Sequence, residues 1–181
     1  MKIRRIVTGH GPDGKSRVAS DTMVDPVTVA LSPATEFFTL WGGDKLPSFP
    51  DDGSPRTFSS YFPPPGGFRF CVTTLAPEGA RPAVPDMDAA RREMEEKLPG
   101  LAARMDPNVP GMHSSDTIDF IYVVSGEIWM TVDDGTEVHL HPGETLVQNG
   151  TRHSWRNKGK EPCIFVICFI GTPRISLRSA L

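Results

Sequence analysis

Histidines are the residues of this chain best suited to metal or acid–base chemistry, and there are five: His10, His113, His139, His141 and His153. A neutral imidazole binds divalent metals and exchanges protons near neutral pH. Asp119 lies between His113 and His153 in the sequence, six residues after His113. Two histidines and one carboxylate are the ligand set of non-haem iron(II) sites and also serve catalytic zinc. These residue types indicate a metal or acid–base site if the fold brings the three side chains together.

His139 and His141 form a second pair, at the spacing that places two side chains on one face of a strand. Two imidazoles on one face can share a metal ion. However, Val138 and Leu140 alternate with them and are the apolar residues of this segment. If these two face the core, both histidines face water. The pattern therefore favours a solvated sheet edge over a metal site.

The distance between His113 and Asp119 restricts the folds that can unite them. On one continuous strand they would lie about 20 Å apart, at ~3.3 Å per residue. Ligands of a shared metal ion each lie about 2 Å from it. The chain must therefore bend between the two, and residues 114–117, Ser-Ser-Asp-Thr, supply turn-forming side chains. His153 comes from a distant strand, and a barrel brings such inward-facing side chains together.

Short strand patterns separated by glycine-containing turns fill the chain from residue 118 onward. They read IDFIYVV, EIWMTVDD, TEVHLH, ETLVQN and EPCIFVICFIG. Strands at about ten-residue spacing with glycine turns predict an antiparallel barrel or sandwich. The segment 163–170 is apolar throughout, which predicts a strand buried on both faces.

The N-terminal half is rich in turn residues. Residues 2–8 and 16–24 alternate apolar and polar around HGPDGK, which predicts a β-hairpin. We expect residues 25–66 to form an ordered loop or extended arm, because this segment is rich in Pro and Gly but also carries aromatic side chains that need burial. Residues 67–75 read as a strand. The segment 88–98 is the one convincing helix, with Asp86 or Asp88 as its N-cap and Pro99-Gly100 as its end.

Composition narrows the classes of partner. The 181 residues suit one structural domain. The net charge of −3 and the absence of a Lys/Arg run argue against nucleic acids and anionic membranes as partners. No signal peptide or run of about 18 apolar residues is evident. Three cysteines without zinc or redox spacing indicate reduced thiols in a cytoplasmic protein.

The motifs around His113 and His153 resemble those of the cupin superfamily. In the first cupin motif, His113 takes the place of the first metal-binding histidine, Ser115 that of the second histidine, Asp119 that of the glutamate and Gly126 that of the closing glycine. Ser115 removes one imidazole, and Asp119 is one methylene shorter than glutamate. Both departures weaken the ligand set.

The second cupin motif is matched by residues that follow the next hairpin. They are Gly143, Gly150, His153 and Asn157, with Gln148-Asn149 in place of the usual proline step. The resemblance covers residues 111–171 and is weaker before them. It is closest to single-barrel cupins with an extended N-terminal half.

This resemblance implies an all-β fold: a cupin-type antiparallel barrel of the double-stranded β-helix or jelly-roll kind. Residues 1–105 would be an N-terminal extension with a hairpin and one short helix. Residues 106–181 would hold the barrel motifs within the same structural domain. It also implies a small-molecule ligand and a homodimer.

The site residues that follow fall into two groups. The metal ligands would be His113, Asp119 and His153, holding iron, manganese, nickel or zinc. The ligand pocket would be lined by the residues that share their faces, namely Ser115, Gln148, Trp155 and Asn157. No catalytic residue is assigned.

Two functions stay open. One is a metal-dependent enzyme acting on a small organic acid, enol or phenol, as an oxygenase, decarboxylase, isomerase or dehydratase. The other is a metal-free cupin that binds a small ligand as a sensor or carrier. A third, structural role would use the N-terminal hairpin for strand addition to a partner.

Overall fold

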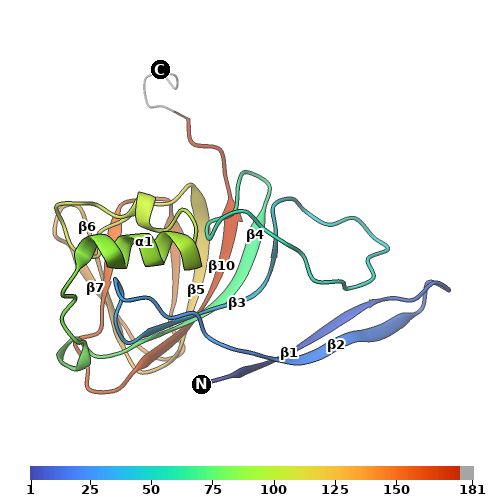
Figure 1. The fold of residues 1–181 in the computed structure, drawn as a ribbon, viewed down its shortest axis with the longest axis horizontal. Coiled ribbons are helices and arrows are strands. Elements are labelled where there is room, and N and C mark those ends of the chain that lie inside the picture. The colour runs from blue at the N-terminus through green and yellow to red at the C-terminus, as the bar shows by residue number, and fades with distance from the viewer. Residues whose placement is uncertain (176–181) are drawn as a thin grey trace.

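Antiparallel pairing organises the computed structural model, which describes residues 1–175, into two sheets and a separate hairpin (Figure 1). The larger sheet has five strands in the order β3 (Thr35–Gly43), β4 (Phe68–Leu75), β10 (Cys163–Gly171), β5 (Thr117–Ser125) and β8 (Thr145–Asn149). The smaller sheet has three, in the order β7 (Glu137–Leu140), β6 (Ile128–Val132) and β9 (His153–Arg156). Both sheets contribute to one hydrophobic core, with Val123 and Phe165 from the larger and Ile128 and Leu140 from the smaller. The predicted all-β fold is confirmed.

Strict alternation along β5 decides which side chains point inward. Thr117, Asp119, Ile121 and Val123 are buried, whereas the residues between them, such as Phe120, are half-buried or exposed. Successive side chains of a strand point to opposite faces. This alternation places Asp119 on the inner face of the five-stranded sheet.

β10 was predicted to be buried on both faces, and this is wrong. Phe165 and Ile167 on its inner face are buried, but the other face is only partly covered and Ile170 is 38% exposed. The cause is that the main core lies on the inner face of the sheet. Ile164 and Val166 on the outer face pack against a smaller apolar cluster that includes residues of β3, β4 and the N-terminal hairpin.

The predicted N-terminal hairpin is present as β1 (Ile3–His10) paired with β2 (Ser16–Val24). It extends away from the barrel, and only its base approaches the outer face of the larger sheet (Figure 1). Residues 25–66, expected to be loop or arm, also contain β3, which pairs with β4. The five-stranded sheet therefore joins strands from both sides of residue 105.

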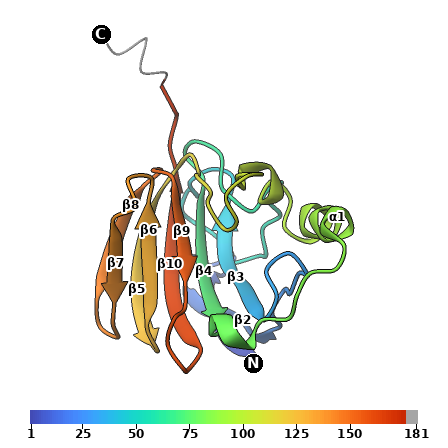
Figure 2. The same ribbon diagram turned by 90° about the vertical axis from the view of Figure 1, so that its left-hand side faces the viewer.

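The helix α1 (Met87–Lys97) begins at Asp86, whose carboxylate accepts a hydrogen bond of 2.8 Å from the Ala89 amide. Ala90, Met94 and Leu98 are buried, and the last two belong to the main core. In Figure 2, α1 lies on the side of the larger sheet where β3 forms the edge. Two short 3₁₀ turns, Glu78–Ala80 and Ala102–Arg104, flank the helix in sequence.

Candidate functional site

A cavity of about 690 Å³ lies against the inner face of the five-stranded sheet and is also lined by α1, β9 and the loop that precedes β5. This volume is within the range of small-molecule sites. Much of its wall is aromatic: Phe37, Tyr61, Phe62, Trp155, Phe165 and Phe169. Its polar groups include Thr73, His113, Asp119 and His153. The three predicted metal ligands thus line one cavity.

His113 and His153 meet although they are far apart in the sequence. Their backbones form a reciprocal pair of hydrogen bonds, each 2.9 Å from N to O. Their ring centroids lie 4.4 Å apart. His153 is the first residue of β9, and His113 lies in the loop before β5. The bridge between these two segments is therefore what brings the two imidazoles together.

A backbone carbonyl lies next to Nδ1 of each ring. Nδ1 of His113 lies 3.0 Å from the Gly111 carbonyl, and Nδ1 of His153 lies 2.9 Å from the Thr151 carbonyl. A carbonyl only accepts, so in the neutral His113 ring the proton is on Nδ1 and the Nε2 lone pair is free. His153 Nδ1 also lies 2.9 Å from the Gln148 amide nitrogen, a donor, so either nitrogen of that ring can carry the proton. Burial lowers the pKa of both histidines, and together with the charge of His113 it brings that of His153 to about 4. Both rings are therefore neutral at pH 7.

Within the described residues, three acids line the cavity, and Asp119 is the one that is buried and forms no ion pair; Glu78 and Asp106 are paired with arginines. Thr117 Oγ1 donates to Asp119 Oδ1 and accepts from the Ser115 hydroxyl, at 2.6 Å. Oδ2 of Asp119 takes part in no hydrogen bond among residues 1–175. Burial raises the pKa of this carboxyl to about 6, against the opposing effect of the Thr117 hydrogen bond. Asp119 can therefore gain or lose a proton near neutral pH.

The donor atoms fit a divalent metal only in part. A metal-binding imidazole has its other nitrogen donating to a carbonyl or carboxylate, as the His113 ring does here. However, His113, Asp119 and His153 do not form a group whose ligand atoms all lie within 4.8 Å of one another. The one such group within residues 1–175 is Glu127, His139 and His141. As placed, the cavity offers a metal two imidazoles and no third protein ligand.

The four predicted pocket residues lie in different places. Trp155 lines the cavity, with its ring edge-on to His153 at 5.6 Å between centroids. Ser115, Gln148 and Asn157 are buried but lie outside the cavity lining. Their side chains instead bind neighbouring parts of the chain.

Hydrogen bonds to neighbouring segments explain why Gln148 and Asn157 lie outside the cavity lining. The Gln148 amide lies 2.9 Å from His153 Nδ1 and also binds Thr151, so it supports the histidine from behind. Asn157 Nδ2 donates to the carbonyls of Leu75 and Glu161, at 2.9 Å each. Asn157 therefore ties the end of β9 to β4 and to the next turn.

Part of the wall comes from residues that the sequence motifs do not mark. Tyr61 is buried, 5.7 Å from Phe169 and 5.0 Å from Phe62 between ring centroids. Burial raises the pKa of its hydroxyl well above the usual value, so it stays protonated. The high aromatic content of residues 25–66 was the available signal, but it did not reveal which side chains would enter the cavity.

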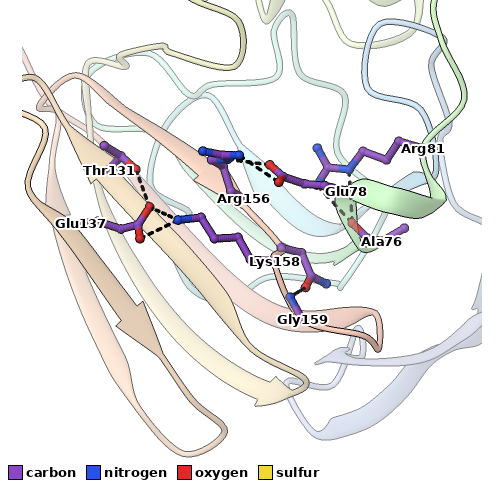
Figure 3. A network of polar contacts seen from close by, with 9 residues as sticks. Ala76, Glu78, Arg81, Thr131, Glu137, Arg156, Lys158 and Gly159 are labelled. Carbon is purple, nitrogen blue, oxygen red and sulfur yellow. Dashed lines mark hydrogen bonds and ion pairs between the residues drawn. The ribbon is translucent and has the colours of Figure 1, made fainter.

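Arginines lie at the rim of the cavity. Arg156 donates two hydrogen bonds to Glu78, at 2.6 and 3.0 Å, and Arg81 donates to the Ala76 carbonyl (Figure 3). Arg91 on α1 also lines the cavity, is half-buried and forms no ion pair within the described part of the chain. Within residues 1–175, the rim therefore holds two cations that form no ion pair, Arg81 and Arg91.

Two further observations concern the whole chain. No helix within residues 1–175 is long and apolar enough to cross a membrane. All three cysteines are free thiols, two of them buried.

Comparison with known proteins gives three kinds of match. Residues 104–169 match the family model described as "Cupin domain". Over 47 residues the chain is 43% identical to "Phomopsin biosynthesis cluster protein C'" of Diaporthe leptostromiformis. This aligned segment covers 26% of this chain and 25% of the relative. Over 51 residues it is 39% identical to "Oryzines biosynthesis cluster protein J" of Aspergillus oryzae, 28% of each chain. The matched segments thus span about a quarter of the curated relatives.

Among solved structures, the "Cnp3 Cupin Domain" of Schizosaccharomyces pombe aligns over 94% of this chain and 89% of that chain, with 13% identity and a TM-score of 0.48.

Proposed function

We propose that this chain, a member of the cupin superfamily through the domain at residues 104–169, is an enzyme that transfers protons on a small organic acid, enol or phenol. The observation that carries the proposal is the composition of the cavity wall. Asp119, His113 and His153 face one space of about 690 Å³ whose other walls are largely aromatic. A few polar groups on an apolar wall are typical of a small-molecule site.

The walls favour a substrate with a flat, apolar body. Tyr61, Trp155 and Phe165 offer ring faces and edges at which such a body would pack. Arg91 at the rim is available to pair with a carboxylate. A phenolic or enolisable carboxylic acid fits both features.

Asp119 is the candidate general acid and base. Its pKa of about 6 keeps both protonation states accessible near neutral pH, as a proton-transfer group requires. The ionised carboxylate takes a proton from a carbon next to a carbonyl, and the resulting carboxylic acid returns that proton to another atom. Nε2 of His113 accepts a hydrogen bond from a substrate hydroxyl and so orients it. Isomerisation and dehydration are reactions of this kind.

Because the histidine pair fits a metal in part, the same site raises the question of whether it binds a divalent ion. A divalent ion on His113 and His153 would supply Lewis-acid or oxygen-binding chemistry. Elemental analysis of purified protein beside a His113→Ala/His153→Ala variant tests it. About one equivalent of iron, manganese, nickel or zinc that is lost in the variant would support the metal-dependent reading.

The relatives support a small-molecule role. The two curated relatives described above are named as biosynthesis cluster proteins, one for phomopsin and one for oryzines. The match covers about a quarter of each, so it supports the class of function and not a particular reaction.

Proton transfer is tested with a panel of phenolic and enolisable carboxylic acids. Compounds that raise the melting temperature are incubated with the protein in D₂O, and NMR follows both conversion and deuterium incorporation at carbon. We expect Asp119→Asn to lower turnover by about 10²–10⁴-fold. The same variant should retain thermal stabilisation by the ligand, since it keeps the size and shape of the side chain.

The alternative is a metal-free sensor or carrier. It is favoured by Ser115, which lies in place of a cupin histidine and binds Thr117 instead of facing the cavity. It predicts ligand-induced stabilisation that chelators do not change, with no conversion and no deuterium incorporation. That result with wild-type protein would overturn the enzyme proposal.

A further inference from the structure

A second group of possible metal ligands lies on the smaller sheet, outside the cavity. His139 is on β7, His141 directly follows β7, and Glu127 directly precedes β6. In the β6–β7 pairing Ile128 faces Leu140 and Trp129 faces His139. None of the three candidate ligands lines the cavity.

The pleat of the hairpin places these side chains together. Ile128 and Leu140 are buried in the core, so their neighbours along each strand point to the other face. Glu127 and Trp129 are therefore on the same face of β6 as His139 and His141 are of β7. Extending the register by one pair sets Glu127 across from His141.

The ligand atoms are already close. Nε2 of His139 lies 2.8 Å from Oε2 of Glu127, and the rings of His139 and His141 are 4.0 Å apart between centroids. One atom from each of the three residues lies within 4.8 Å of the other two. The side chains of His139 and Glu127 are 34% and 37% exposed, which leaves an entry path for an ion from solvent.

We propose that Glu127, His139 and His141 form a surface site for a divalent transition-metal ion of the zinc class. Two imidazole nitrogens and one carboxylate oxygen are ligands that Zn²⁺ accepts, with water in a fourth position. Ca²⁺ and Mg²⁺ prefer all-oxygen sites and are not expected here. The ion would join β6 to β7 at the edge of the smaller sheet.

Neighbouring side chains hold His139 in place. The Trp129 ring stacks on the His139 ring at 3.8 Å between centroids and an interplanar angle of 11°. The nearby ammonium of Lys158 is bound to Glu137, at 2.5 and 2.6 Å, so its charge is already paired (Figure 3). A ring that is already oriented loses less freedom when it binds a metal. This stacking is what distinguishes the group from two freely rotating surface histidines.

Zn²⁺ binding, measured by competition with a chromophoric chelator, tests the proposal. We expect wild-type protein to bind one equivalent more than His139→Ala/His141→Ala. Glu127→Gln should weaken that equivalent by at least ~10-fold, since even residues that only support a ligand cost about that much. Glu96→Gln removes an exposed acid on α1, far in sequence from this hairpin, and it should leave binding unchanged.

Tryptophan fluorescence separates this site from the cavity. Cu²⁺ bound here would quench Trp129, whereas Cu²⁺ on the cavity histidines would quench Trp155, which packs against His153. We expect the first phase of quenching to vanish in Trp129→Phe and to persist in Trp155→Phe. Equal Zn²⁺ stoichiometry and affinity in wild type, Glu127→Gln and the double variant would overturn the proposal. So would quenching that is unchanged in Trp129→Phe.

Discussion

Burial of Asp119 couples the ionisation of its carboxyl to the stability of the fold. Its pKa is raised from 3.8 to about 6 by burial. Between these values the folded chain holds a proton that the unfolded chain has released, so this carboxyl lowers stability as the pH rises. The buried His153 acts in the opposite direction, because its lowered pKa adds stability as the pH rises from about 4 to 6.5. The two effects partly cancel in the wild-type protein.

A variant isolates the contribution of the carboxyl. Asp119→Asn does not ionise, while His153 is common to both proteins. We expect the free energy of unfolding of the variant to rise relative to wild type between about pH 4 and pH 6.5, by roughly 3 kcal/mol at most. Urea unfolding across this pH range measures it. A difference that does not vary with pH would mean that Asp119 titrates at its ordinary value.

The sequence predicted the positions of some single side chains and missed those of others. His113, Asp119 and His153 line one cavity, and their assignment as metal ligands stays a prediction. Spacing gives the face on which a side chain lies but not its partner, so Gln148 was placed in the pocket although it binds Thr151. Glu127 was not noticed beside His141, because that proximity depends on the register of the β6–β7 hairpin.

At the scale of elements, α1 closes the cavity and the core together. Met94 is 1% exposed, belongs to the main core and lines the cavity. The helix was predictable because Asp86, the apolar stripe and Pro99-Gly100 are local signals. β3 was not fully predictable, because Pro and Gly are frequent on both sides of it and its pairing with β4 is long-range.

Truncation of Met94 tests this role of the helix. We expect Met94→Ala to lower the free energy of unfolding by about 2–5 kcal/mol, because it removes buried methylenes and leaves a void. Glu96→Ala, on the exposed side of the same helix, should change it by no more than about 0.5 kcal/mol. Urea denaturation of both variants provides the measurement. Similar values for the two would mean that α1 does not pack against the barrel.

At the scale of the whole molecule, the outer face of the five-stranded sheet is apolar and uncovered at one end. Phe70, Cys168, Phe120 and Val147 form a row across four neighbouring strands. Phe120 and Val147 are 50% and 54% exposed. The base of the hairpin covers the other end of this face, through Ile3 and Val24 among others. A contiguous exposed apolar row is a feature of interaction surfaces.

A second copy of the chain is the partner that we predict for this face. A twofold contact uses the same patch on both copies, so a single apolar row can pack against itself. We expect light scattering at micromolar concentration to give twice the mass of one chain, and Phe120→Glu/Tyr122→Glu to give one. Leu46→Glu, which changes an exposed loop residue, is the control and should remain dimeric. Circular dichroism checks that each variant is folded. A single-chain mass for wild-type protein would contradict the predicted homodimer. If the double-Glu variant stayed dimeric, the dimer interface would lie elsewhere than on this face. The projecting β1–β2 hairpin would then be the next segment to delete.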